Sequence, residues 1–148
     1  SRLHDWRLGW LFGRRLCRLT HVGRKAGKRY RTVVEVVGRD KAADEVMVVC
    51  GFGRTADWYR NLHANGSAEI EIGLRKYEAE WRELDVERAA SVMADYERRN
   101  WLIAPITRRI LSGVVGWRYD GSEETRRRLV TEMPILAFRY ARNVRKCP

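Results

Sequence analysis

Two neighbouring segments, residues 68–72 and 76–84, alternate between apolar and charged side chains. In "AEIEI", and in "KYEAEWREL" as far as Trp81, every second residue is apolar, and the residues between are charged. A period of two is the spacing of a β-strand that buries one face and leaves the other in water. Because a short connection through Gly73 and Leu74 joins them, we predict an antiparallel hairpin with one solvated face.

Further strands are predicted where Val and other β-branched residues cluster. These segments are residues 29–38 and 45–50, together with the apolar run at 135–140. A short helix is predicted at 55–65, with Thr55 as its N-cap. Strands and helices do not alternate regularly, as they would in parallel βαβ units. We therefore predict an α+β fold whose mostly antiparallel sheet curls into a barrel.

A helical block is predicted at residues 86–132. Asp85 precedes a segment with apolar residues at helical spacing, Ser122 opens a second helix, and Pro134 follows its end. No repeat or change of composition divides the chain. We expect a single domain over residues 1–148.

The N-terminal segment is predicted as an amphipathic helix over residues 1–17, with a helical pattern that runs from 3 to 19. Trp6 and Trp10 recur at helical spacing among several arginines. Two interpretations remain open. One is an interfacial membrane helix, and the other is a terminal helix docked on the core with arginine stems over apolar surface.

The chain is strongly basic, with a formal net charge of +11 from 30 Lys and Arg against 19 Asp and Glu. This balance predicts an anionic partner such as an anionic membrane surface or a phosphorylated or carboxylated small molecule. No nucleic-acid-binding motif appears, so we expect no nucleic acid. The three cysteines lack metal-ligand spacing, so we expect no metal and a reducing cytoplasmic location. Peripheral attachment to the inner face of the cell membrane is an alternative.

Two glycine-rich basic stretches are candidate anion sites. In the first, Gly23 allows a tight turn beside Arg24 and Lys25. In the second, Gly51 and Gly53 precede the predicted helix at 55–65. The free amides and dipole of a helix N-terminus favour an anion.

The stretches "LTHVGRKAGKRYRTVVEVV", "CGFGRTADWYRNLHAN" and "ADYERRN...GWRYDG" resemble the deazaflavin-dependent nitroreductase family of actinobacteria. The resemblance covers about residues 17 to 140. It implies a split β-barrel, similar to the flavin-binding barrels, with flanking helices. It also implies coenzyme F-420, an 8-hydroxy-5-deazaflavin with a phosphate and an oligoglutamate tail, as the cofactor, with FMN less favoured.

The resemblance also implies which residues bind the coenzyme. The coenzyme-binding segments of the family are a basic segment and the loop before the "WY" helix. In this chain they correspond to Arg24, Lys25, Arg31, Thr32, Cys50, Gly51, Phe52, Gly53, Arg54 and Trp58. The chain departs from the family pattern at Tyr30, within a pair that is often Pro-Arg, and at Cys50, which is often Ser.

The activity implied is hydride transfer from the reduced coenzyme to a small hydrophobic, electron-poor acceptor: a quinone, an enone or a nitro compound. Tyr96 is the catalytic candidate, because "ADYERRN" occupies the place of the family's substrate-side tyrosines. The competing interpretation is that Tyr96 only packs in the core. Trp101 and Ile103 are candidates for lining the acceptor site, or are ordinary packing residues.

A non-enzymatic function is the alternative. In this reading the barrel is a carrier that binds a fatty acid or the coenzyme at a membrane without turnover. The departures at Tyr30 and Cys50 motivate it. The sequence leaves the oligomeric state open.

Overall fold

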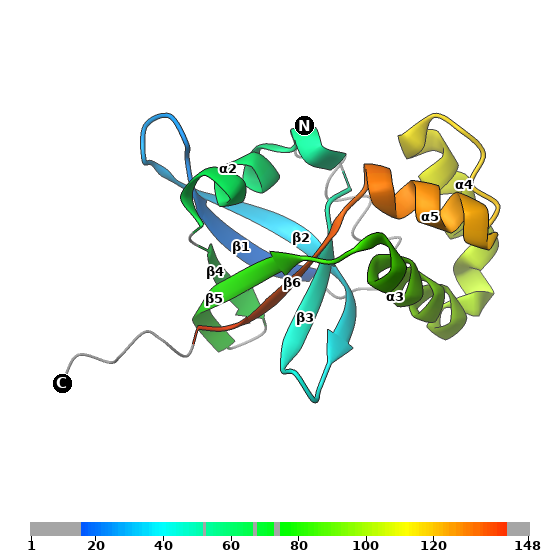
Figure 1. Ribbon diagram of the computed structural model, residues 1–148, viewed down its shortest axis with the longest axis horizontal. Helices are drawn as coiled ribbons and strands as arrows, with labels where there is room; N and C mark the ends of the chain where they lie inside the picture. The colour runs from blue at the N-terminus through cyan, green and yellow to red at the C-terminus, as the bar shows by residue number, and fades with distance from the viewer. Residues whose placement is uncertain (1–15, 52, 67, 73–74, 142–148) are drawn as a thin grey trace.

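The computed structural model describes residues 16–51, 53–66, 68–72 and 75–141 (Figure 1). Within these ranges the strands form a closed barrel in the order β1-β2-β3-β6-β5-β4, and every neighbouring pair is antiparallel. The predicted α+β class with an antiparallel barrel is confirmed. The strands are β1 (Leu16–Val22), β2 (Arg29–Asp40), β3 (Glu45–Val49), β4 (Ala68–Ile72), β5 (Arg75–Glu83) and β6 (Ile135–Tyr140).

Helices cover the barrel in two places (Figure 1). The short η1 (Gly53–Thr55) leads into α2 (Asp57–Asn65), which packs against β1. The remaining helices follow β5 and gather on one side of the barrel, at the right of Figure 1. They are α3 (Val86–Arg99), η2 (Trp101–Ile103), α4 (Ala104–Val115) and α5 (Glu123–Glu132). They occupy the segment in which the sequence predicts a helical block.

The predicted N-terminal helix is wrong at its C-terminal end. Residues 16–19 belong to β1, where Cys17 is paired with Val34 and Leu19 with Thr32. β1 also pairs with β4 on its other edge, so strand neighbours on both sides satisfy its backbone and override the local helical spacing. Residues 1–15, which carry the rest of that prediction, lie outside the described residues.

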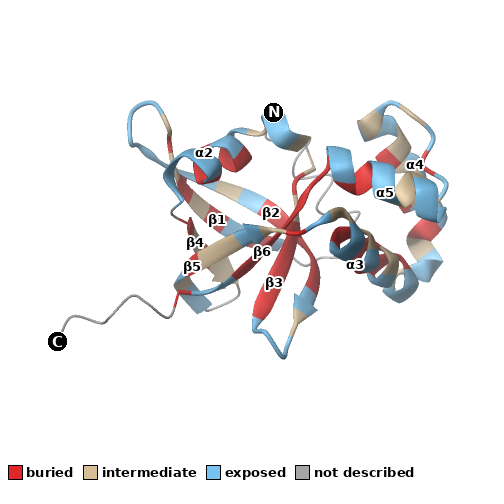
Figure 2. Cartoon of the chain, in the orientation of Figure 1, coloured by how far each residue is buried: buried red, intermediate tan, exposed pale blue. Residues whose placement is uncertain are grey.

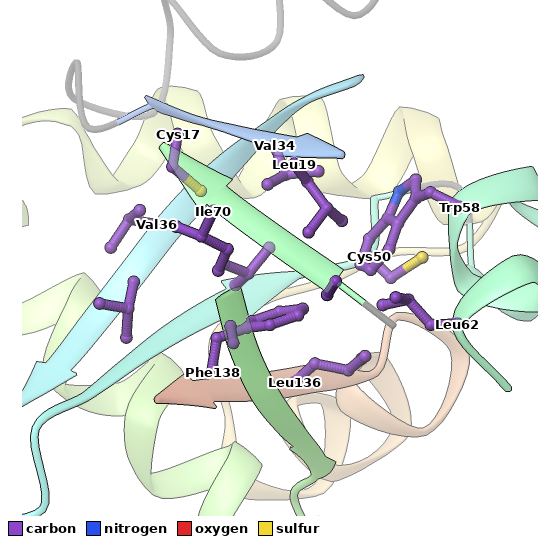
Figure 3. Close-up of a cluster of buried hydrophobic side chains, with 14 of the residues drawn as sticks. Cys17, Leu19, Val34, Val36, Cys50, Trp58, Leu62, Ile70, Leu136 and Phe138 are labelled. Carbon is purple, nitrogen blue, oxygen red and sulfur yellow. The ribbon is translucent and has the colours of Figure 1, made fainter. Parts of the chain in front are cut away.

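The two faces of β2 belong to two different hydrophobic cores. Val34 and Val36 face the barrel interior, where they pack with Leu19, Ile70 and Phe138 (Figure 3). This cluster is the barrel core. Val37 belongs instead to a second cluster, the helix-side core, which lies between the barrel and α3 to α5. Because both faces are covered, residues 34–38 of β2 are all buried (Figure 2), which explains the nearly continuous Val run.

The starts of α3 and α5 follow local sequence signals, and the start of α2 does not. The Asp85 side chain accepts a hydrogen bond from the Arg88 amide at the start of α3, and Ser122 does the same for Thr125 at the start of α5. Both predicted helix starts are confirmed. The predicted Thr55 cap is wrong, because α2 starts one residue later, with Ala56 at its N-cap and no side-chain cap.

A buried carboxylate ties the helical block together. Glu97 of α3 accepts hydrogen bonds from the Tyr119 hydroxyl at 3.0 Å and from the Arg126 guanidinium of α5 at 2.8 Å. Arg108 of α4 approaches the other carboxylate oxygen at 3.5 Å. With three donors around one buried acid, the helices are held in a fixed arrangement beside the barrel.

Two structural features are absent from the described residues. No helix there has the length and apolar character needed to cross a membrane. No group of three or more His, Cys, Asp or Glu side chains is placed to hold a metal ion.

Candidate functional site

A cavity of about 710 Å³ runs along the outside of the barrel, between β2, α2 and the helical block. This volume is in the usual range for cofactor and small-molecule sites. One end is basic and lies at the loop between β1 and β2. The opposite wall is apolar and is built by the helix-side core. The apolar residues include Val37, Val49, Met93, Leu111, Leu129 and Met133.

The loop between β1 and β2 is closed by its own backbone. The Gly23 amide donates to the Lys28 carbonyl at 2.7 Å, and the Gly27 amide donates to the Gly23 carbonyl at 3.1 Å. Gly27 has a φ of +66°, and a Cβ on Gly23 would lie 2.7 Å from the Tyr30 ring. The positive φ favours glycine at position 27, and a side chain at position 23 would require the Tyr30 ring to move.

The Arg24 side chain attaches the basic loop to α2. Its guanidinium donates to Asn61 Oδ1 at 2.7 Å and to Asp57 at 3.3 Å, and its backbone amide also donates to Asn61 Oδ1 at 3.2 Å. Arg24 lines the cavity, but much of its hydrogen-bonding capacity is used within the protein. Its clearest role is to position the loop.

A buried histidine completes this link. Because Asn61 Oδ1 accepts from Arg24, its amide nitrogen is the group that donates to His21 Nδ1, 2.9 Å away. Nδ1 is therefore unprotonated, and burial lowers the pKa of His21, with an opposing effect from Asp57. His21 and Asn61 both line the cavity. Neither residue is among the candidates predicted from the sequence, although Asn61 lies within the "DWYRNL" stretch.

Lys25 and Arg31 are the cations that remain available to a ligand. Both are exposed and line the cavity. Neither has an ion pair with any carboxylate of the described residues, whereas the neighbouring Arg29 is paired with Glu69 at 3.6 Å. Lysine and arginine in this position are suited to phosphate or carboxylate groups.

Glu35 is an acid in the wall of the cavity, on the outward face of β2. The residue is 8% exposed, and one carboxyl oxygen lies 3.3 Å from the Tyr96 hydroxyl of α3. Burial raises the pKa of Glu35 to about 9, although the hydrogen bond from Tyr96 opposes the rise. Glu35 is therefore protonated at neutral pH. In the sequence, the one signal for this residue is that a charged side chain interrupts the apolar run "TVVEVV".

Tyr96 itself is buried in the helix-side core and does not line the cavity. Burial raises its pKa, and the nearby Glu35 raises it further. Tyr96 is thus a core-facing residue of α3 whose hydroxyl also contacts the cavity acid. Its catalytic role stays a prediction.

The second predicted anion loop contributes less than the first. Gly51 lines the cavity, but Cys50 is buried and its thiol donates to the Gly53 carbonyl at 2.9 Å. Arg54 turns away to pair with Glu83 at 3.1 Å and to donate to the Tyr59 hydroxyl at 2.6 Å. Phe52 lies outside the described residues.

The structure therefore brings together only part of the predicted site. Around the cavity it places Arg24, Lys25, Arg31, Thr32, Gly51 and Trp58. It does not place Cys50, Gly53, Arg54, Tyr96, Trp101 or Ile103 in the cavity wall. Trp101 is 68% exposed on η2, so it is not an ordinary packing residue.

The closed antiparallel barrel with flanking helices defines a split-barrel protein. Within this class the chain belongs to the family described as F420H2-dependent quinone reductase, which it matches over residues 7–103. The expected cofactor, coenzyme F-420, is confirmed by this assignment. The family description names a quinone as the acceptor. A search of curated proteins finds no match.

Comparison with solved structures supports the fold. A reductase dependent on F420-H2 aligns with a TM-score of 0.52 and 18% identity, over 84% of this chain and 94% of the other. A heme storage protein from Vibrio cholerae aligns with a TM-score of 0.56 and 14% identity, over 97% and 93%. A conserved hypothetical protein from Mycobacterium tuberculosis aligns with a TM-score of 0.55 and 12% identity, over 97% and 81%.

The residues around the cavity fit the expected coenzyme. Lys25 and Arg31 offer positive charge that no described carboxylate neutralises, which suits a phosphate and a glutamate tail. The indole of Trp58 and the apolar wall provide a dry surface for an aromatic ring system.

Proposed function

We propose that the chain reduces a quinone by hydride transfer from reduced coenzyme F-420. The observation that carries this proposal is one cavity with a cationic end and an apolar wall. When bound, the coenzyme supplies the hydride, and the protein supplies orientation and exclusion of water. In this proposal the anionic coenzyme and the apolar acceptor occupy neighbouring parts of the cavity.

The cationic end holds the anionic part of the coenzyme. Lys25 and Arg31 bind its phosphate and glutamate groups, while Arg24 keeps the loop against α2. Thr32 and Gly51 lie along the cavity between the basic loop and the apolar wall, and Trp58 lines it from α2. Among the remaining predicted binding residues, Cys50 and Gly53 hydrogen-bond to each other beside Gly51, and Arg54 pairs with Glu83.

The apolar wall holds the acceptor. Met93, Leu111 and Leu129 present aliphatic surface from three different helices, which favours a flat hydrophobic molecule such as a quinone ring. Enones and nitro compounds are the other acceptor classes with this character. A panel of all three classes, compared by kcat/KM, identifies the preferred one.

The first test is binding of coenzyme F-420 to the purified chain, followed by quenching of tryptophan fluorescence with FMN as competitor. Because Trp58 lines the cavity, a Trp58→Phe variant shows whether the signal comes from this site. Lys25→Ala is expected to weaken binding about tenfold, the value of one charge-assisted hydrogen bond. Arg39→Ala is the matched control, because Arg39 is equally exposed but lies outside this cavity.

The second part of the test is turnover of a water-soluble quinone by the reduced coenzyme. Saturable binding that depends on Lys25, with quinone reduction, supports the proposal. Binding without turnover of any acceptor supports the carrier alternative instead. Mass spectrometry of ligands extracted from the purified protein then separates a fatty-acid carrier from a coenzyme carrier.

We also propose that the protein attaches to an anionic membrane surface, because of an exposed apolar group on η2 and α4. Trp101, Leu102 and Ile106 are 68%, 75% and 55% exposed. The exposed arginines Arg98 and Arg109 flank them in the sequence. Exposed aromatic and aliphatic side chains beside cations are typical of a surface that contacts the membrane interface.

Flotation with vesicles tests this attachment. The chain is expected to float with vesicles of anionic lipid and not with zwitterionic ones, and Trp101→Ser with Leu102→Ser is expected to abolish binding. Removal of residues 1–15 is the comparison, since it tests the predicted N-terminal helix and leaves β1 intact. If the same fraction of the double variant and of the unaltered chain floats with the vesicles, the η2 surface is not the anchor.

A further inference from the structure

Glu35 is an acidic residue of the cavity wall, and it lies away from the basic loop between β1 and β2. Among the described residues only Glu35 and Asp57 are acids that line this cavity, and Asp57 is already paired with Arg24. Glu35 lies on β2 between its register partners Leu16 of β1 and Val49 of β3. Both partners line the cavity as well. The carboxyl group is therefore set in an apolar wall, where the acceptor is proposed to bind.

The groups around Glu35 keep its proton in place. The elements packed beside it contribute aliphatic side chains, among them Leu16, Val49 and Met93. The described polar contact of the carboxyl group is the Tyr96 hydroxyl of α3. The Arg99 guanidinium of the same helix donates to the Val37 carbonyl at 2.8 Å instead. A carboxyl group in such surroundings is neutral, because the single hydrogen bond from Tyr96 offsets only part of the cost of removing its charge from water.

We propose that Glu35 donates the proton that completes reduction of the quinone, and that Tyr96 is a positioning residue for its carboxyl group. This inference rests on the proposed function. The Glu35 O–H bond breaks while an O–H bond forms on the quinone oxygen. The quinone is the oxidant, and the reduced deazaflavin provides the hydride with its electron pair. The Glu35 carboxylate then takes a proton back from water at the open side of the cavity.

The chemistry requires a group of this kind. Addition of a hydride to a quinone leaves negative charge on its oxygen, and an anion in an apolar chamber is costly unless it is protonated or hydrogen-bonded. A positioned acid that is protonated at the working pH typically contributes 10²- to 10⁴-fold to such a step. Burial keeps Glu35 protonated, and no cation among its described contacts favours the charged form.

The protonation state can be measured without turnover. Infrared difference spectra of the full chain between pH 7 and pH 10 are expected to show loss of the C=O band of a protonated carboxyl group. The band is expected to be absent in Glu35→Gln and to remain in Glu45→Gln. Glu45 is the matched control because it is equally buried but paired with Arg82 at 2.8 Å. A wild-type spectrum with no such band at pH 7 overturns the inference.

The role of the proton is tested by single-turnover reduction of a soluble quinone. Glu35→Gln is expected to slow the reaction about 100-fold with coenzyme affinity unchanged, and to remove the fall in rate above about pH 9. Tyr96→Phe is expected to move this fall to higher pH, because the Tyr96 hydrogen bond lowers the pKa of Glu35. A purely structural Tyr96 would not move it.

The two proposals fail in different ways. If the wild-type chain does not bind coenzyme F-420 or reduces no quinone, the proposed function is wrong whatever the infrared band shows. If the wild-type chain reduces quinone and Glu35→Gln does so at the same rate and with the same pH profile, only the role of Glu35 is wrong.

Discussion

The Arg24 guanidinium donates a 2.7 Å hydrogen bond to the side-chain oxygen of Asn61, 37 residues further along the chain. This contact fixes the β1–β2 loop to α2 and thereby sets the position of the neighbouring Lys25. The same Asn61 donates to the buried His21. One amide side chain therefore holds the cationic end of the cavity together.

Replacement of Asn61 by Ala is expected to cost about 1–3 kcal/mol of unfolding free energy, because the buried His21 nitrogen loses its donor and Arg24 loses its acceptor. Urea denaturation measures the loss. Asp57→Asn is the control, since Asp57 is 82% exposed and bonds the same guanidinium. That change is expected to cost under about 1 kcal/mol. Equal losses in both variants would contradict the role assigned to Asn61.

Gly53 is expected to tolerate no side chain, although Gly51 two residues earlier does. Gly53 has a φ of +72°, and an added Cβ would lie 2.8 Å from the Glu132 carbonyl oxygen. Gly53→Ala is therefore expected to lower stability by about 1–3 kcal/mol. At Gly51 no atom lies within 4 Å of an added Cβ, so Gly51→Ala is expected to stay within about 0.5 kcal/mol. Thermal unfolding distinguishes the two variants.

Glu35 is expected to make the protein less stable as the pH rises. Its pKa is about 9 in the folded chain, against an ordinary value of 4.5, so the folded state binds more protons than the unfolded state between these values. Unfolding free energy then falls by up to about 1.4 kcal/mol per pH unit in this window. Glu35→Gln is expected to remove that slope in denaturation measured from pH 5 to pH 9.

Glu45 is the control, because its contribution to the unfolding free energy changes with pH in the opposite direction. Hydrogen bonds from Arg82 lower the pKa of Glu45, so its contribution is present above the ordinary pKa and is lost as the pH falls through the lowered one. Glu45→Gln is expected to reduce stability at neutral pH and to leave the alkaline slope intact. An alkaline slope that persists in Glu35→Gln would show that another group causes it.

Glu97→Gln is expected to loosen the helical block. Glu97 is 6% exposed and faces Arg126 and Tyr119, and removal of one partner from a buried pair leaves the other charge uncompensated, at a cost of about 3–5 kcal/mol. Hydrogen exchange is expected to increase first in α4 and α5. Glu87→Gln serves as the comparison, because its pair with Arg127 is on the surface, and little change is expected there.

Some features of the protein follow from short stretches of sequence. The alternation in residues 68–83 is enough to identify β4 and β5 as an antiparallel pair, because each strand has one buried face. Asp85 and Ser122 mark helix starts because a cap needs only the amides of the next turn. The basic loop and the family motifs are likewise local, and they identify the class of cofactor.

Other features depend on partners far away in the chain. The helical spacing in residues 16–19 is overridden by pairing with β2 and β4. The cations of the basic loop look alike in sequence, but the fold neutralises Arg24 and Arg29 with carboxylates from α2 and β4 and leaves Lys25 and Arg31 available.

The sequence by itself therefore determined the antiparallel sheet, the helical block, the cationic loop and the deazaflavin cofactor. Only the tertiary structure decided that Glu35 faces the cavity beside Tyr96, 61 residues away. The physical reason is that both faces of β2 are buried, so the sequence pattern does not show which face meets the barrel core and which meets the helices. A register shift against β3 between Val36 and Gly38 disturbs that pattern further.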